Sequence, residues 1–270
     1  MSQRRTPRKL PSYRNPPLTE VACGLKFQPL EKLTIPHVGV FWESLRKDFP
    51  NVQHAAPLGV DEGTIDRTTN LPVPRIWLIN KADDRLLQIQ RNMFFYNWRR
   101  RQASKPYPRY PSIVKQFRRR FSSFIDFLGE NDLGSISPIE CELAYINHIP
   151  RGEGWDSIDG ISRILPDFNW QRKESRFLPH PSGISWNWIF DLPSEMGELS
   201  VKLQQGIRKI DNTPILTLEL RASVNLSEET DYSLWEWFPV AHEWIVQGFA
   251  DLTGRRVQEG VWKRDDNFVR

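Results

Sequence analysis

The chain has 270 residues, of which 39% are hydrophobic and 26% are charged, and its formal net charge is +4. This length and apolar content suffice for one large core or two small ones, so we expect a folded globular protein. The sequence lacks the run of about 18 apolar residues that a membrane-spanning helix needs, and no apolar stretch follows the basic N-terminus as in a secretory signal. We therefore expect a cytoplasmic protein that does not contact a membrane.

Charge is divided unequally between the two halves of the sequence. Residues 1–130 contain 23 Lys and Arg against 11 Asp and Glu, whereas residues 131–270 contain 14 against 22. Such a division suggests that the first half meets a polyanion or an acidic protein surface. The alternative is that the basic half of one copy docks on the acidic half of another copy.

The first half begins with a basic, proline-containing arm at residues 1–17, which we expect to be flexible. Alternating apolar positions then predict a strand at residues 18–30. Apolar residues at helical spacing predict a helix that begins at Pro36 and ends before Pro50. Residues 51–74 are polar and irregular, and they predict a long loop.

Two strands around a turn at Lys81–Asp84 are predicted for residues 75–99. An amphipathic helix over residues 111–129, with Gly129 as its stop, and a strand over residues 137–149 complete the first half. The order strand, helix, strand, strand, helix, strand is that of a ferredoxin-like unit, in which the first and last strands are neighbours. The apolar stripe of the predicted helix consists of Ile113, Phe117, Phe121, Phe124 and Leu128.

The second half, residues 151–270, reads as another α+β unit that loosely echoes the first. The pattern predicts a short helix at 156–167, strands at 183–192, 198–207 and 213–224, and a final helix at 233–252. We therefore expect an α+β chain with mostly antiparallel sheets, in which a ferredoxin-like half at residues 18–150 packs with a related second half as one unit.

The two cysteines, Cys23 and Cys141, lie in apolar, strand-like segments without the spacing of a zinc site. We expect reduced, buried thiols. In a ferredoxin-like order the two could lie close together in one sheet without being bonded.

The stretch from Gln88 to Trp98 carries the strongest functional signal. Read as one strand, it places a set of polar and aromatic residues on one face: Gln88, Gln90, Asn92, Phe94, Tyr96 and Trp98. A single-stranded RNA platform uses such a face, with bases stacked on rings and arginines on phosphates. The alternative is that the other half or a second copy covers this face, where the rings serve packing.

Basic residues follow this stretch and recur on the predicted helix. We expect nine of them to bind nucleic acid or a partner: Arg99, Arg100, Arg101, Lys105, Arg109, Lys115, Arg118, Arg119 and Arg120. Four other residues are expected to tie the strand exit to the following helix: Asn97, Trp98, Tyr107 and Tyr110. Arg99 or Arg109 would pair with a carboxylate or phosphate, which leaves Arg100, Arg101 and Lys105 exposed in the loop.

The motifs indicate no catalytic residue, metal site or cofactor. The five histidines lack the spacing of metal-ligand pairs, signatures of nucleophiles and phosphate loops are missing, and His242 is expected to be a core or capping residue. The acids Asp61, Glu62 and Asp66 could gather round a cation, but acids in such loops are far more often solvated.

Three groups of residues resemble one family of bacterial proteins. They are NPPLTEVACGLKF near the start, QIQRNMFFYNWR followed by YPRY in the middle, and WEWFPVAHEWIVQGFADLT with VWKR near the end. The family is sporadically distributed and uncharacterised, and the matching segments run in order through nearly the whole chain. Because such a distribution is similar to that of genes moved with mobile elements, the resemblance implies a setting in bacterial conflict or antiphage defence. It implies no catalytic residues.

Three functions remain open. The sequence favours a non-catalytic binding or assembly subunit of a conflict or antiphage-defence system, which associates with itself or with a protein encoded nearby. The second is a component that binds RNA or single-stranded DNA through the basic first half. The third is a metal-independent ribonuclease that uses His37 or His54 as an acid-base group.

Overall fold

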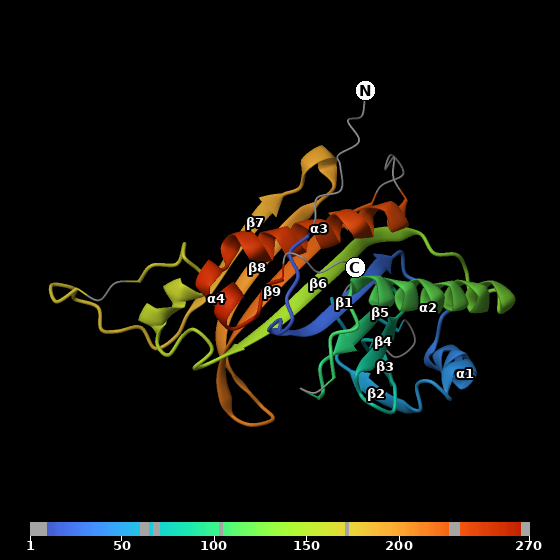
Figure 1. Cartoon of the computed structure of the whole chain (residues 1–270). Coiled ribbons are helices and arrows are strands. Elements are labelled where there is room, and N and C mark those ends of the chain that lie inside the picture. Colours follow the sequence, from blue (N-terminus) through green and yellow to red (C-terminus); the bar gives the residue numbers. More distant parts are fainter. Residues whose placement is uncertain are drawn as a thin grey trace. The chain divides into compact units, whose positions relative to one another are not determined.

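The computed structural model describes residues 10–59, 65–66, 71–102, 105–170, 173–226 and 233–265 (Figure 1). The chain divides into two compact units. The first unit consists of Thr19–Ala144 and Ser223–Glu236, and the second consists of Met1–Leu18, Tyr145–Ala222 and Trp237–Arg270. The units are therefore interleaved along the sequence, and neither coincides with one of the predicted halves at residues 18–150 and 151–270.

The chain is mixed α+β with mostly antiparallel strand pairs, as the sequence predicts. In the described ranges, no helix combines the length and the apolar content that crossing a membrane requires. Residues 1–9 of the expected arm lie outside the described residues. The rest of the arm is anchored, because Tyr13 is buried and forms a β-bridge with Arg264.

The strands of the first unit follow the order β2-β3-β4-β5-β1-β6. Its elements are β1 (Leu18–Phe27), α1 (Ile35–Leu45), β2 (Asn51–Ala55), β3 (Arg75–Ile79), β4 (Arg85–Gln90), β5 (Met93–Arg99), α2 (Tyr110–Glu130) and the start of β6 (Pro138–Pro150). The expected neighbours, β1 and β6, do lie side by side. A ferredoxin-like start is not confirmed, since four strands rather than two separate α1 from α2.

The strands of the second unit follow the order β6-β9-β8-β7. Its further elements are the 3₁₀ helices η2 (Ile158–Arg163) and η3 (Pro193–Glu195), the strands β7 (Ser185–Asp191), β8 (Glu198–Arg208) and β9 (Thr213–Asn225), and the helices α3 (Leu234–Leu252) and α4 (Arg255–Gly260). In both units the first strand lies next to the strand that precedes the long helix: β1 lies next to β5, which precedes α2, and β6 lies next to β9, which precedes α3. The two units therefore share this feature of strand order, in keeping with the loose similarity that the sequence suggests between the halves.

The core of the first unit forms where α2 packs on β5. All five residues of the predicted apolar stripe of α2 are buried. The ring of Phe94 on β5 stacks on Phe124 at a centroid distance of 5.0 Å and contacts Phe117 and Phe121 as well. Large aromatic side chains bury much apolar area, so this cluster contributes strongly to the stability of the unit. In Figure 1, α2 lies alongside the strands of the first unit, next to β5.

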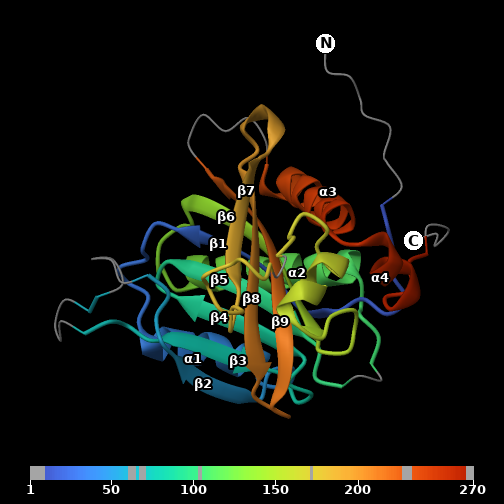
Figure 2. The ribbon, with the colours of Figure 1, turned by 90° about the vertical axis from the view of Figure 1, so that its left-hand side faces the viewer.

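The structure corrects the prediction of two strands in residues 75–99. A turn at Arg91 and Asn92 breaks the second predicted strand, and β5 folds back on β4 with Gln90 opposite Met93. Figure 2 shows β3, β4 and β5 as successive strands of one sheet.

This turn also separates the polar from the aromatic side chains. Residues that face each other in an antiparallel pair share a face of the sheet, and Gln88 faces Phe95 whereas Ile89 faces Phe94. The rings of Phe94, Tyr96 and Trp98 therefore lie on the face that α2 covers. Gln88 and Asn97 lie on the opposite face, so the expected polar and aromatic platform does not form.

The predicted loop at residues 51–74 begins with a strand instead. Residues Asn51–Ala55 form β2, which pairs antiparallel with β3 and is the outermost strand of the first unit. Asp61 and Glu62 lie outside the described residues, and the backbone N–H of Asp66 donates to Leu71 O at 2.9 Å.

Both cysteines are buried, unbonded thiols in the first unit. Burial raises the pKa of the Cys141 thiol to about 12 and also raises the pKa of Cys23. Both thiols are therefore uncharged and unreactive at neutral pH.

Gly39 lies on the exposed face of α1, where an added Cβ would meet nothing within 4 Å. Glycine costs a helix interior about 0.5–1 kcal/mol relative to alanine, because its unfolded backbone has more freedom. We expect Gly39→Ala to raise the free energy of unfolding by about that amount, measured by urea denaturation. A lowered value would contradict the open position of this residue.

His148 on β6 should make the stability sensitive to mild acid. Burial lowers the pKa of His148 from its usual 6.5, and the charge of Arg208 lowers it further. The His148 imidazole therefore binds a proton more readily in the unfolded chain than in the folded chain. As a result, the free energy of unfolding is highest above about pH 6.5, where His148 is neutral in both states, and it decreases as the pH falls below this value. We expect His148→Gln to flatten the dependence of the unfolding midpoint on pH between about 5 and 7, where histidine normally titrates. The same substitution at the exposed His54 serves as the control.

Candidate functional site

A groove opens at one end of the first unit, between β2, β3 and the exit of β5. Its volume is about 520 Å³. The lining residues are Pro50, Asn51, Val52, Gln53, Trp77, Ile79, Asp83, Arg99 and Arg101. We call this site the Trp77 groove. Because β2 is the outermost strand of the unit, the groove reaches the open edge of the sheet.

Trp77 forms the aromatic wall of the groove. It faces Gln88 on β4 and Gln53 on β2, which places it on the sheet face opposite α2. The guanidinium carbons of Arg75 and Arg99 lie 5.4 Å and 5.8 Å from the centre of its ring system. At these distances a cation interacts with the face of an indole. The indole N–H of Trp77 has no hydrogen-bond partner among the described residues.

Asp83 in the turn between β3 and β4 holds two of the arginines. Its backbone has a φ of 54°, a conformation that turns favour for Asp and Asn. Its carboxylate accepts a hydrogen bond from Arg99 and pairs with Arg101 at 2.7 Å. Arg101 is therefore not an unengaged loop charge, although it remains exposed.

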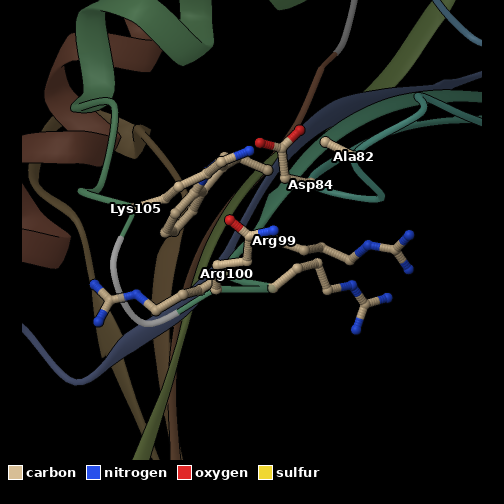
Figure 3. Close-up of a pocket in the computed structure, with 8 residues that line it drawn as sticks. Ala82, Asp84, Arg99, Arg100 and Lys105 are labelled. Atoms are coloured by element: carbon tan, nitrogen blue, oxygen red, sulfur yellow. The ribbon is translucent and has the colours of Figure 1, made fainter.

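The groups around Trp77 carry an excess of positive charge, because Asp83 pairs with both Arg99 and Arg101. Burial lowers the pKa of Arg99, the charge of Arg101 lowers it further, and Asp83 and Glu20 raise it. Burial also lowers the pKa values of Arg75 and Arg100. A lowered pKa means that the surroundings disfavour the cation, here chiefly because burial removes water from the guanidinium groups. Figure 3 shows a second, smaller pocket at the exit of β5, which Arg99 and Arg100 line together with Asp84 and Lys105.

A chain of side-chain hydrogen bonds crosses four strands on the groove face. Arg75 on β3 donates to Gln88 on β4 at 2.8 Å, and Gln88 donates to Asn97 on β5 at 2.7 Å. Asn97 in turn donates to Glu20 on β1 at 2.6 Å. Asn97 is therefore part of a buried network that fixes Arg75 beside Trp77, instead of a clamp at the strand exit.

Aromatic contacts connect the exit of β5 with the start of α2. The rings of Trp98 and Tyr107 lie 5.1 Å apart, as expected of a clamp. The guanidinium carbon of Arg100 lies 6.0 Å from the centre of the Trp98 ring, and that of Arg109 lies 5.7 Å from the centre of the Tyr107 ring. Tyr110 is the first residue of α2, and burial raises the pKa of its phenol.

The basic residues of α2 do not join the Trp77 groove. Lys115, Arg118 and Arg119 are exposed on the helix, which covers the opposite face of the sheet. Arg118 lies 4.9 Å from the ring of Trp235. Arg120 is 8% exposed and forms an ion pair with Asp48 at 2.5 Å, so its charge is engaged inside the unit. The nine predicted cations therefore do not gather on one surface, and the buried guanidinium of Arg120 pairs with the exposed carboxylate of Asp48.

The histidines considered for acid-base chemistry lie away from the groove. His37 caps α1, because its Nδ1 accepts a hydrogen bond from the backbone N–H of Thr34 at 3.2 Å. His54 faces Ile76, on the sheet face opposite Trp77. His242 is buried in the second unit beside Tyr145, at 3.0 Å from its hydroxyl.

The sequence did not point to Trp77, which lines the groove, or to Arg75, whose guanidinium carbon lies 5.4 Å from the centre of the Trp77 ring. The alternation Arg75, Trp77, Ile79 in a short strand was the available signal, since it places a cation and a ring side by side on one face.

Comparison with known proteins adds little to this geometry. No family model and no curated protein matches the chain. One similar solved structure is the crystal structure of DynU16, a protein of the dynemicin biosynthetic locus, which is 12% identical over 87% of this chain and 96% of that chain, with a TM-score of 0.26. A TM-score this low supports no argument, so the function has to be inferred from the groove itself.

Proposed function

We propose that the protein is a non-catalytic binding subunit that holds single-stranded nucleic acid in the Trp77 groove. The observation that carries this proposal is the ring of Trp77, flanked by the guanidinium groups of Arg75 and Arg99 and facing an open groove of about 520 Å³. Single-strand binding proteins combine the same two elements, an aromatic ring on which a base stacks and cations that follow the phosphates.

The polar wall of the groove supports a single strand in preference to a duplex. Asn51 and Gln53 lie on the same sheet face as Trp77, so their amides can bond the exposed edges of an unpaired base. In a duplex these edges are paired and the faces of the bases are stacked, so Trp77 has no base to hold. Arg101 at the rim then contacts a phosphate with the guanidinium nitrogens that Asp83 leaves available.

Nucleic acid takes precedence over the protein partner that the sequence favours, because cations and a ring converge in one open groove. The setting in bacterial conflict or antiphage defence, which the family resemblance implies, belongs to the proposal and is compatible with a nucleic-acid ligand. A ribonuclease is disfavoured, because His37 caps a helix and His54 lies on the other face of the sheet.

Fluorescence anisotropy with labelled oligonucleotides tests the proposal. A single strand of about 10 nucleotides, within the range that such domains cover, should bind, whereas a duplex of the same sequence should bind more weakly. Contact with about three phosphates predicts a slope near −2 when the logarithm of the association constant is plotted against that of the salt concentration. Lack of binding at low salt would rule the proposal out, and cleavage of the oligonucleotide would favour the ribonuclease.

A further inference from the structure

The strand β7 ends the sheet in the second unit, and its outer edge has no strand neighbour among the described residues. It spans Ser185–Asp191, and five of its seven residues are exposed. Natural edge strands are usually protected by Lys, Pro, bulges or shortness. The sequence of β7, SWNWIFD, contains neither Lys nor Pro, and its only charge is at the last position.

The main chain of β7 presents hydrogen-bonding groups to this open edge. On the inner side, the N–H of Gln205 donates to Ile184 O at 3.0 Å, and the N–H of Leu192 donates to Gly197 O at 2.8 Å. Alternate residues of an antiparallel strand bond to the same neighbour. The even-numbered residues of β7 therefore bond to β8, and the N–H and C=O groups of Asn187 and Ile189 point outward.

The side chains of β7 form an aromatic row on one face. The rings of Trp186 and Trp188 lie 4.3 Å apart, and those of Trp188 and Phe190 lie 6.1 Å apart. Helix α3 does not close over the end of this row. A groove of about 430 Å³ lies between Phe190 and Leu199 on the strands and Trp244 and Asp251 on the helix.

We propose that β7 pairs antiparallel with β7 of a second copy of this chain, about a two-fold axis at Trp188. Asn187 then faces Ile189 of the second copy, and their outward N–H and C=O groups bond to one another. Trp186 faces Phe190 of the second copy, and Trp188 faces its own counterpart. Aromatic residues directly opposite each other stabilise an antiparallel pair, and one surface serves both copies, as a two-fold dimer requires.

The pattern of the strand selects this register. If the pairing shifted by one residue, the outward N–H and C=O groups of odd-numbered residues in the second copy would face even-numbered residues, whose N–H and C=O groups already bond to β8. Shifts by two residues keep the hydrogen bonds possible, but they leave at least one ring of each row without a ring opposite it. Only the register centred on Trp188 pairs Trp186, Trp188 and Phe190 together.

Disulfide trapping tests the register directly. Residues in a non-hydrogen-bonded antiparallel pair have Cα atoms about 4.5 Å apart, within the range of about 4.4–6.8 Å that a disulfide spans. We expect Trp188→Cys to form a covalent dimer upon mild oxidation with oxidised glutathione. Ile189→Cys should stay monomeric on a denaturing gel, because its counterpart lies on a diagonal of more than about 7 Å. The native thiols, both buried, provide no background.

Sedimentation velocity of the full chain provides the second measurement. The wild-type protein should be a dimer, and Asn187→Pro should be a monomer, since proline removes an outward N–H without removing a bond to β8. Ile207→Lys, at a 66% exposed position on β8, is the matched control and should remain a dimer. A wild-type monomer overturns the proposal. So does a dimer that Asn187→Pro leaves intact, or a covalent Ile189→Cys dimer formed as readily as that of Trp188→Cys.

Discussion

Gly24→Ala is expected to lower the free energy of unfolding by about 3 kcal/mol, at the upper end of what overpacking of a core costs. A Cβ atom on Gly24 would lie 2.4 Å from Phe95 Cγ and 2.6 Å from Phe94 O. The second of these atoms belongs to the backbone of the neighbouring strand and cannot rotate away. Gly24 lies opposite Phe95 in the pairing of β1 with β5, so relief of the clash requires the two strands to separate.

Urea denaturation of the purified variant measures this effect. Gly206→Ala is the matched control, because Gly206 also lies in a strand but its added Cβ would meet nothing within 4 Å. The control should change the free energy of unfolding by less than about 1 kcal/mol, the span of intrinsic strand preferences. Equal effects of the two substitutions would contradict the close approach of β1 and β5.

Trp77→Ala is expected to weaken the binding of a single-stranded oligonucleotide by about 10- to 100-fold, since stacking of one base contributes about 1–3 kcal/mol. The slope of affinity against salt should hardly change, because no phosphate contact is removed. Arg101→Gln should behave differently. It should weaken binding and make the slope shallower by about 0.7, the value for one phosphate of a single strand.

Two controls separate the groove from the rest of the surface. Trp244→Ala removes a half-buried Trp of the second unit, and Arg119→Gln removes an exposed cation of α2. Neither residue lines the Trp77 groove. Both variants should bind like the wild type within about twofold, a free-energy difference that lies within the usual range for surface substitutions. A loss at Arg119 as large as that at Arg101 would move the binding surface to the helix.

The periodic elements of this fold were predictable, and the strand reversal inside residues 75–99 was not. The apolar stripe of α2 follows the helical period, and its five residues are buried as predicted. In contrast, Arg91 and Asn92 form the turn between β4 and β5 without glycine or proline. A continuous strand would place Gln90 and Met93 on opposite faces, whereas the two-residue turn places them opposite each other on one face. Every face assignment beyond the turn was therefore inverted relative to β4.

The site was only partly predictable for a related reason. Arg99 and Arg101 were candidates from the charge pattern, but Trp77 and Arg75 join them through strand pairing, which no single segment of sequence specifies. The burial of Arg120 did have a local signal. It follows Phe117 by three residues and precedes Phe124 by four, so the helical period places it beside the apolar stripe. Its charge is then satisfied by Asp48, far away in the sequence.

Photocrosslinking tests the central claim most directly. A short single-stranded RNA that carries 4-thiouridine is bound at low salt and irradiated, and the crosslinked peptides are identified by mass spectrometry. If the Trp77 groove holds the strand, the crosslinks should fall in β3 at Trp77 and at the exit of β5 around Arg101. Crosslinks confined to Lys115, Arg118 and Arg119 on α2, with none in the groove, would contradict the account.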